Sequence, residues 1–111
     1  YTKFEYSDLK VNGMVVSFDL ENTGGVDGSE VAQLYLGFPA AAGEPPIQLK
    51  SFQKVFVKSG AKTNVQMTLT KRDVSIWSAV EHKFIVFKGD FKVNVGASSR
   101  DLRLNAQMTI N

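Results

Sequence analysis

The sequence predicts an all-β protein, a two-sheet antiparallel β-sandwich of about seven or eight short strands. Apolar and polar residues alternate with a period of two in several segments, and turn signals recur roughly every 8–12 residues. No segment of about a dozen residues has the period of an amphipathic helix. The length of 111 residues, with 43% hydrophobic and 22% charged residues, is typical of one soluble globular domain. We therefore expect a single domain over residues 1–111, without internal repeats or an interdomain linker.

The first half of the chain contains two predicted strands and two predicted turns or loops. Met14–Leu20 alternates apolar with polar residues, and the glycine-rich stretch Asn22–Gly28 then predicts a turn. Val31–Leu36 is apolar on both phases apart from Gln33, as in a central strand that is covered on both faces. Phe38–Pro46 contains all three prolines, so we expect a loop.

The middle of the chain continues the strand pattern and includes one short helical signal. Leu49–Val57 has an unclear apolar phase, which predicts a bulge near Ser51–Phe52. After a turn at Ser59-Gly60, Val65–Leu69 alternates regularly. Thr70–Trp77 is the one place where a helical turn is expected, with Thr70 as N-cap and an aspartate three residues later.

The last part of the chain contains two predicted hairpins. Lys83–Phe87 and Phe91–Val95 flank Lys88-Gly89-Asp90, which predicts a hairpin with a three-residue connection. The polar bend Ala97–Asp101 separates the second of these strands from a final strand over Leu102–Ile110. The residues expected to point between the two sheets share the apolar phase of their strands. They are Phe18, Leu20, Leu34, Leu36, Val65, Met67, Leu69, Phe91, Val93 and Val95.

Charge is distributed unevenly along the chain although the net charge is only +2. Residues 1–49 have a net charge of −5 and residues 50–111 a net charge of +7. A basic face for a polyanion would explain this distribution, as would strands from the two halves that interleave. No four basic residues are adjacent, so we favour interleaving and expect no nucleic-acid partner. No apolar run approaches the roughly 20 residues that a membrane-spanning helix needs, so no membrane partner is expected either.

No group of residues has a pattern that predicts catalysis. Asp19 and Glu21 share a strand phase with solvent, opposite to the apolar phase, and are expected to serve solubility. His82 is the only histidine and lies beside Glu81 in a predicted connection, so a nucleophile–base pair is not expected. Asp27–Glu30 has the composition of a weak calcium loop without its ligand spacing, and we interpret it as a turn. We expect no metal, no cofactor and no catalytic residue.

Several motifs together resemble the fibronectin type III-like module found at the C-terminus of glycoside hydrolase family 3 enzymes, the β-glucosidase-like proteins. Tyr1–Lys10 resembles the entry into that module, so the chain is expected to begin at a domain junction. Six further motifs follow in order: Leu20–Gly24, Glu30–Leu36, Glu44–Pro46, Gln48–Phe52, Arg72–Trp77 and Val95–Leu102. The family pattern usually has glycine where Ser51 stands. The similarity extends over essentially the whole chain.

The resemblance implies a non-catalytic function. The family's nucleophile and acid/base residue lie in other domains, so no catalytic residue transfers to this chain. The module is expected to support stability, with the catalytic domains of a parent glycosidase as partners. The resemblance also implies a secreted, extracellular protein. The sequence shows no signal peptide, so an export signal is expected either to belong to a longer precursor or not to exist.

Two other functions are open at this stage. A self-standing carbohydrate-binding, lectin-like sandwich would need exposed aromatic side chains, and the candidates are Tyr1, Tyr6, Tyr35, Phe38 and Trp77. A structural adhesion-type module would bind protein partners instead. For Trp77, the only tryptophan, we favour a buried anchor at the crossover because apolar Val74 and Ile76 flank it. The alternative is stacking on a sugar or on a partner domain.

Overall fold

The computed structural model describes residues 3–39, 42–43 and 47–110. Within these ranges the chain is almost entirely β-structure, with a short 3₁₀ helix between β5 and β6. The strands are β1 (Phe4–Asn12), β2 (Val15–Asn22), β3 (Gly28–Gly37), β4 (Gln48–Val57), β5 (Lys62–Thr68), β6 (Ser75–Ser78), β7 (Lys83–Val86), β8 (Gly89–Ser98) and β9 (Asp101–Ile110). The 3₁₀ helix is η2 (Lys71–Val74).

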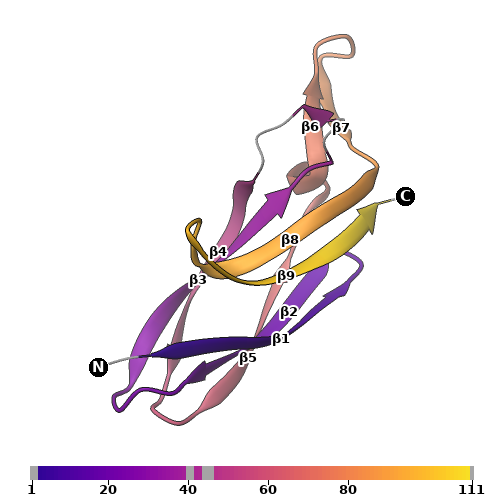
Figure 1. Cartoon of the computed structure of the whole chain (residues 1–111). Helices are drawn as coiled ribbons and strands as arrows, with labels where there is room; N and C mark the ends of the chain where they lie inside the picture. The colour runs from indigo at the N-terminus through magenta and orange to yellow at the C-terminus, as the bar shows by residue number, and fades with distance from the viewer. Residues whose placement is uncertain (1–2, 40–41, 44–46, 111) are drawn as a thin grey trace.

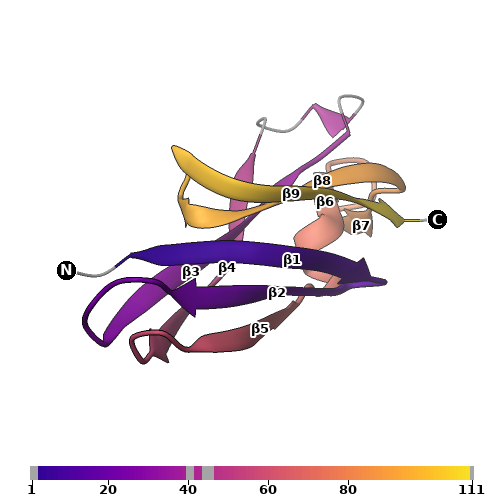
Figure 2. The same ribbon diagram turned by 60° about the horizontal axis from the view of Figure 1, so that its bottom comes forward.

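The strands form two packed sheets and a separate ribbon. One sheet has the order β1-β2-β5, the other has the order β4-β3-β8-β9, and all neighbouring strands are antiparallel. Figure 2 shows the two sheets as separate layers. Within the described ranges, strands β6 and β7 pair only with each other, and they extend beyond the sheets (Figure 1). The predicted antiparallel sandwich is confirmed, with seven strands in the two sheets and two more in the ribbon.

The hydrophobic core lies between the two sheets. All ten residues expected there are buried, and they belong to one continuous cluster. The apolar phase of β2 faces that of β3 and β8 across the interior, which is why a period of two identified these positions. The cluster also contains residues that the prediction omitted, namely Phe4, Tyr6, Val16, Ala32, Val57, Val74 and Met108.

The turn between β2 and β3 is held by one buried polar side chain. The amide nitrogen Nδ2 of Asn22 donates to the carbonyl oxygens of Val26 (2.8 Å) and Val57 (2.9 Å). Its Oδ1 accepts from the backbone N–H of Gly24 at 2.9 Å, and Asn22 is fully buried. The turn predicted over residues 22–28 is confirmed, and Asn22 ties it to the end of β4.

Two local predictions in the middle of the chain are confirmed. In the pairing of β3 with β4, Leu34 is opposite Ser51 and Tyr35 is opposite Leu49, so Lys50 is the extra residue of a bulge beside Ser51. Helix η2 begins with a capping box: the backbone N–H of Thr70 donates to Asp73, whose N–H donates to the Thr70 hydroxyl. Phe38, Pro39, Ala42 and Gly43 lie outside any strand, as a loop requires, while Glu44–Pro46 fall outside the described residues.

The hairpin predicted between Lys83–Phe87 and Phe91–Val95 is wrong. β7 pairs with β6, whereas β8 pairs with β3 and β9. Gly89 has a φ of +138°, and a Cβ there would lie 3.2 Å from Cγ of Pro39, so this glycine serves a close approach rather than a hairpin turn. A glycine in the sequence cannot by itself distinguish a hairpin turn from a close approach of two segments. The pairing of β8 with the distant strand β3 decides between them here.

The polar bend near the C-terminus is confirmed as the β8–β9 hairpin. Ser98 pairs with Asp101, so Ser99 and Arg100 form the tip. Before the tip, the two backbones approach so closely that a Cβ on Gly96 would lie 2.0 Å from the carbonyl oxygen of Asp101. Only glycine fits this position without movement of the backbone.

Strands from the acidic and the basic halves of the sequence are neighbours in both sheets. β2 pairs with β5, and β3 lies between β4 and β8. The charges of the two halves therefore mix on the surface, as we expected.

Candidate functional site

The aromatic residues that the sequence offered as contact candidates do not form one site. Tyr6 is in the core, 9% exposed and stacked on Phe18 with ring centroids 5.6 Å apart. Tyr35 is equally buried, and its hydroxyl donates to Gln33. Phe38 is half-buried and packs edge-on against Phe91. Tyr1 lies outside the described residues, which leaves Trp77 as the exposed candidate among the described ones.

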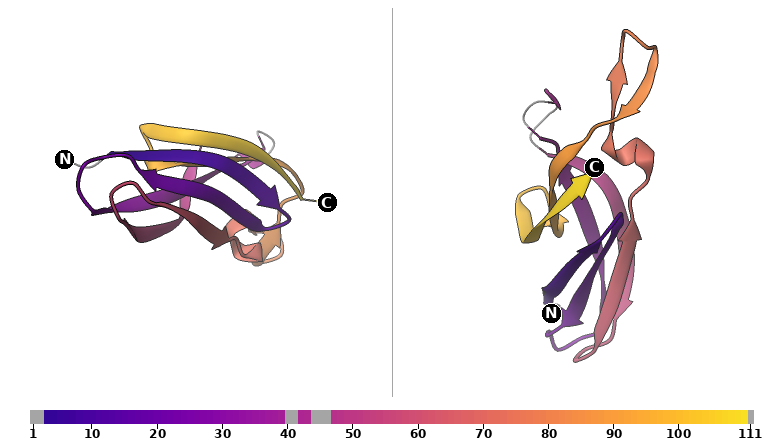
Figure 3. Two further views of the ribbon diagram at one scale, coloured as in Figure 1. Left: turned by 90° about the horizontal axis from the view of Figure 1, so that it is seen from below. Right: turned by 90° about the vertical axis from the view of Figure 1, so that its right-hand side faces the viewer.

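The expectation that Trp77 is a buried anchor is wrong, because 55% of this residue is exposed. It lies on β6, which pairs with β7 alone among the described strands, so no second described sheet covers its outer face. The right-hand view of Figure 3 shows this ribbon, which comprises residues 75–86, standing clear of the sandwich. The apolar neighbours Val74 and Ile76 suggested burial, but Val74 alone reaches the core.

Two further side chains join Trp77 in what we call the ribbon cluster, formed by Arg72, Trp77 and Phe84. Trp77 and Phe84 are opposite each other in the β6–β7 register, and their rings meet edge to face with centroids 5.3 Å apart. The guanidinium of Arg72 lies 3.5 Å from the centroid of the Phe84 ring. Sequence analysis missed Phe84 and Arg72 because it paired β7 with the wrong strand.

A second apolar surface lies on the outer face of the four-stranded sheet. Val31, Leu49, Phe52 and Phe56 are 39%, 49%, 67% and 59% exposed. Phe52 is opposite Gln33 and Phe56 opposite Ser29, so both rings point away from the core. We call these four residues the sheet-face patch. Val31 shows that β3 is covered on both faces only farther along, from Leu34 to Leu36.

The unclear phase of the β4 sequence is the signal that could have located this patch. A strand with apolar residues on both phases either lies within a larger assembly or exposes one apolar face. Phe52 and Phe56 are exposed, so the outer face of β4 is open in the described part of the chain.

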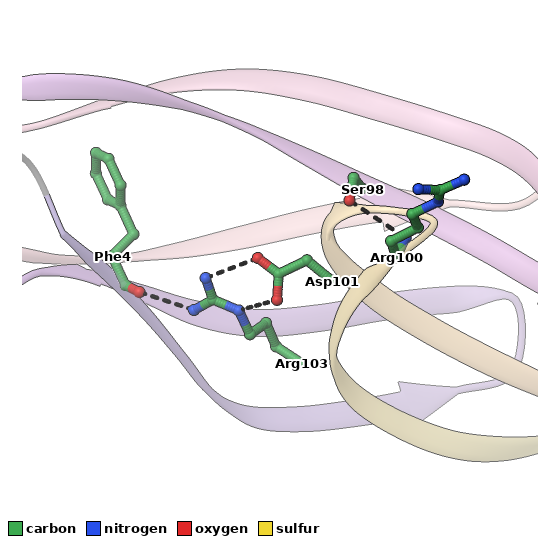
Figure 4. A network of polar contacts seen from close by, with 5 residues as sticks. All are labelled: Phe4, Ser98, Arg100, Asp101 and Arg103. Carbon is green, nitrogen blue, oxygen red and sulfur yellow. Dashed lines mark hydrogen bonds and ion pairs between the residues drawn. The ribbon is translucent and has the colours of Figure 1, made fainter.

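A polar clamp joins the two sheets at the side opposite to β4. Figure 4 shows the guanidinium of Arg103 between Asp101 and the carbonyl oxygen of Phe4. Nε and Nη2 donate to the Asp101 carboxylate at 2.6 and 2.9 Å, and Nη1 donates to the Phe4 oxygen at 3.0 Å. These hydrogen bonds hold the pKa of Asp101 below its ordinary value. The clamp therefore ties β9 to β1.

Tyr6 lies beneath this clamp. The Arg103 guanidinium is 5.5 Å from the centroid of the Tyr6 ring. The buried Tyr6 hydroxyl makes no hydrogen bond among the described residues, and its pKa is raised by burial and then by the nearby Glu30 carboxylate. The buried Tyr6 hydroxyl therefore belongs to the core and cannot contact a ligand from solvent.

The carboxylates Asp19 and Asp27 and the histidine considered for catalysis or metal binding lie apart from one another. Asp19 accepts a hydrogen bond from Asn64 on the outer face of the three-stranded sheet. Asp27 accepts from the backbone N–H of Ser59 at 2.7 Å and so belongs to a turn. His82 lies at the exposed tip of the ribbon with a φ of +53°. Within the described ranges, no three His, Cys, Asp or Glu side chains lie close enough to hold a metal ion.

No helix in the described part of the chain has both the length and the apolar character needed to cross a membrane.

Comparison with known proteins assigns the fold to a family. The sequence model of the fibronectin type III-like domain matches residues 30–99, which is more than half of the chain. The chain therefore belongs to the fibronectin type III-like domain family, as the motifs indicated.

The similar proteins are β-glucosidases. The chain is 50% identical to "Probable beta-glucosidase D" of Aspergillus niger, a match that covers 99% of this chain and 18% of that protein. It is 40% identical to beta-glucosidase cel3A of Pyricularia oryzae, covering 99% of this chain and 16% of that one. This chain thus spans less than a fifth of either relative.

Solved structures show the same relationship. The β-D-glucoside glucohydrolase of Trichoderma reesei superposes with a TM-score of 0.92 at 33% identity, covering all of this chain and 19% of the enzyme. The GH3 β-glucosidase of Bifidobacterium adolescentis gives a TM-score of 0.90 at 32% identity, covering 99% and 17%. The chain corresponds to the fibronectin type III-like part of such enzymes.

Proposed function

We propose that this chain is a non-catalytic accessory module of a secreted glycoside hydrolase, held against the catalytic part of a longer protein by the sheet-face patch. The observation that carries the proposal is this patch, in which Phe52 and Phe56 are 67% and 59% exposed on one strand. Exposed aromatic residues on the same outer face of a sheet are typical of a surface that another protein covers. The share of each relative that the chain covers, less than a fifth, supports the presence of such a partner.

Burial of the sheet-face patch against a partner would contribute a substantial free energy to the assembled protein. Fully burying a phenylalanine side chain contributes about 1.5–3 kcal/mol, so covering the exposed parts of Phe52 and Phe56 would contribute about 2–4 kcal/mol together. This gain would be absent from the isolated chain, where both rings face water. The patch would thus stabilise the assembled enzyme and not the module alone.

A catalytic function has no support from the described residues. Glycoside hydrolysis uses two carboxyl groups that flank a sugar in a cleft. Asp19 instead accepts from Asn64, and Asp101 is engaged by Arg103. We expect the isolated chain to hydrolyse no aryl β-glucoside, and turnover that is lost on substituting one of its carboxylates would contradict the proposal.

Grafting tests the accessory function. The matching segment of the Aspergillus niger relative would be replaced by this chain, and Phe52→Ser/Phe56→Ser would be introduced both in the graft and in the isolated chain. We expect a lower thermal midpoint in the grafted enzyme only, because the rings are solvent-exposed in the isolated chain. Lys54→Ser, on the same face between the two rings, is the matched control. Equal effects of the double substitution in both contexts would refute docking through this face.

A further inference from the structure

The ribbon has apolar side chains at its tip and on one face. Val80 is 90% exposed at the tip, and Trp77 and Phe84 are 55% and 42% exposed. On the other face, Ile76 and Ile85 are half-buried. In a ribbon with four residues per strand that projects beyond its own core (Figure 1), the cross-strand contact of Trp77 with Phe84 stabilises the strand pair, but the exposed parts of these side chains and of Val80 remain in contact with water. Grouped exposed apolar residues of this kind mark an interaction surface.

Arg72 adds a charged group that is already held in place. Its guanidinium lies over the Phe84 ring at 3.5 Å, and Phe84 is braced by the edge of Trp77. Among the described residues, no carboxylate pairs with this guanidinium. Its planar fork of N–H donors is free at the edge of the ring, in the geometry that suits two carboxylate oxygens. The contact with the Phe84 ring already restricts the Arg72 side chain, so less of its freedom is lost on binding.

We propose that the ribbon is a docking element that inserts into an apolar slot on the glycoside-hydrolase part of the same chain, where a carboxylate pairs with Arg72. This inference rests on the proposed function, since it requires that catalytic part to be present. Tryptophan and arginine are the residues most enriched among those that dominate binding energy at protein interfaces. The ribbon cluster supplies both, together with a phenylalanine.

The surroundings of Trp77 favour a protein over a sugar. A sugar site needs hydrogen-bonding side chains beside the aromatic ring, because the hydroxyl groups lose water on binding. Ser78 and Lys83 form the next register pair, so their side chains point to the opposite face from Trp77. Within the ribbon cluster only Arg72 and the Trp77 indole N–H can form hydrogen bonds, which is too few for the several hydroxyl groups of a sugar ring, and the exposed Val80 at the tip adds apolar surface.

The surface next to the ribbon cluster also suits an apolar protein segment. A hollow of about 380 Å³ is lined by Met14, Lys71, Val74, Val86 and Ile110. Val86 is on the same face of the ribbon as Phe84, so the cluster continues into this hollow. The proposed partner is the remainder of such an enzyme. The match to the Trichoderma reesei enzyme covers all of this chain, including the ribbon, within a chain about five times longer.

Hydrogen exchange followed by mass spectrometry tests the inference on the enzyme grafted with this chain. We expect the amides at the ribbon tip, residues 79–82, to exchange at least tenfold more slowly in the graft than in the isolated chain. In the graft with Arg72→Gln, the logarithm of this slowing factor should be at most half of its value in the unsubstituted graft. Arg100→Gln removes the same charge from the exposed tip of the β8–β9 hairpin and should leave the exchange of residues 79–82 unchanged. Unchanged exchange at the tip on grafting, or equal effects of the two arginine substitutions, would overturn the inference.

The β4 amides separate this inference from the proposed function. Slower exchange over residues 49–56 with no change at residues 79–82 would support the accessory function and refute docking of the ribbon. Unchanged exchange in both segments would refute both.

Fluorine NMR gives a second test that does not depend on the graft folding. Trp77 is the only tryptophan, so the chain labelled with 5-fluorotryptophan gives one resonance. We expect this resonance to broaden or shift when the Aspergillus niger relative lacking its matching segment is added. For the Arg72→Gln chain, the same change should require at least a fivefold higher concentration of that relative. Cellotetraose and laminaritetraose should leave the resonance in place. A response to either sugar without a response to the protein, or no response to any addition, would overturn the inference.

Discussion

Replacement of Asn22 by alanine is expected to destabilise the domain more than any change on its surface. The side chain is fully buried and makes three hydrogen bonds to backbone groups of Val26, Val57 and Gly24. Each such bond contributes about 0.5–1.5 kcal/mol net, and a buried group left without a partner costs about 1–3 kcal/mol. Because Val26 is exposed and water can replace one partner, we expect a total loss of about 2–4 kcal/mol.

This loss is a large part of the stability of a domain of this size, which is on the order of 5–15 kcal/mol. At roughly 4–8 °C per kcal/mol, the unfolding midpoint should fall by about 8–32 °C. Urea unfolding followed by far-UV circular dichroism measures the change in free energy, and it does not rely on the exposed Trp77. Asn22→Asp keeps the acceptor for Gly24 but places a buried carboxylate oxygen against the carbonyl oxygens of Val26 and Val57, so it should destabilise the domain at least as much as Asn22→Ala near neutral pH.

Asn64→Ala is the matched control for this prediction. Asn64 is exposed, and its amide donates to Phe18 and Asp19 at the surface, so the loss should stay within about 0.5 kcal/mol. A loss below about 0.5 kcal/mol for Asn22→Ala as well would refute the reasoning that this side chain holds the turn to β4.

Three other substitutions test the core, the hairpin and the clamp. Leu34→Ala empties a fully buried position and should cost about 2–5 kcal/mol in urea unfolding; a loss near zero would place Leu34 outside the core. Gly96→Ala puts a Cβ 2.0 Å from the Asp101 carbonyl oxygen, so the β8–β9 hairpin should shift, visible as amide NMR changes over residues 95–104, whereas Gly25→Ala, with open space around it, should change little. Arg103 holds the pKa of Asp101 below its ordinary value, so the stability from this pair is complete above that ordinary value and is lost as the pH falls through the lower folded pKa. Asp101→Asn should remove this part of the acid dependence of unfolding, and an unchanged pH profile would contradict the clamp.

The sequence predicted the parts of the fold that depend on local alternation. Phe18, Leu20 and their counterparts in β3, β5 and β8 were identified as core because a half-buried strand needs a period of two. The capping box at Thr70 and the turn after Leu20 were found because their signals lie within a few residues. The bulge beside Ser51 was found because it shifts the apolar phase by one residue.

The parts that could not be predicted depend on distant partners. The position of β8 between β3 and β9 is decided by packing across the chain, so the glycine at residue 89 was misinterpreted as a hairpin signal. Burial of Trp77 depends on whether a third strand joins the ribbon, which no local pattern reveals. The sheet-face patch was missed for a similar reason: the outward direction of Phe52 is defined only once β4 pairs with β3.

Docking on a glycoside hydrolase can be measured most directly by isothermal titration calorimetry. The isolated chain would be titrated into the Aspergillus niger relative that lacks its matching segment, at several temperatures. We predict saturable binding with a negative heat-capacity change, because apolar surface is removed from water. Phe52→Ser/Phe56→Ser should weaken this binding at least tenfold, while Lys54→Ser should leave it within about twofold, since about 2 kcal/mol corresponds to more than a tenfold change in affinity. Absence of binding, or binding that the double substitution leaves unchanged, would contradict docking through the sheet-face patch.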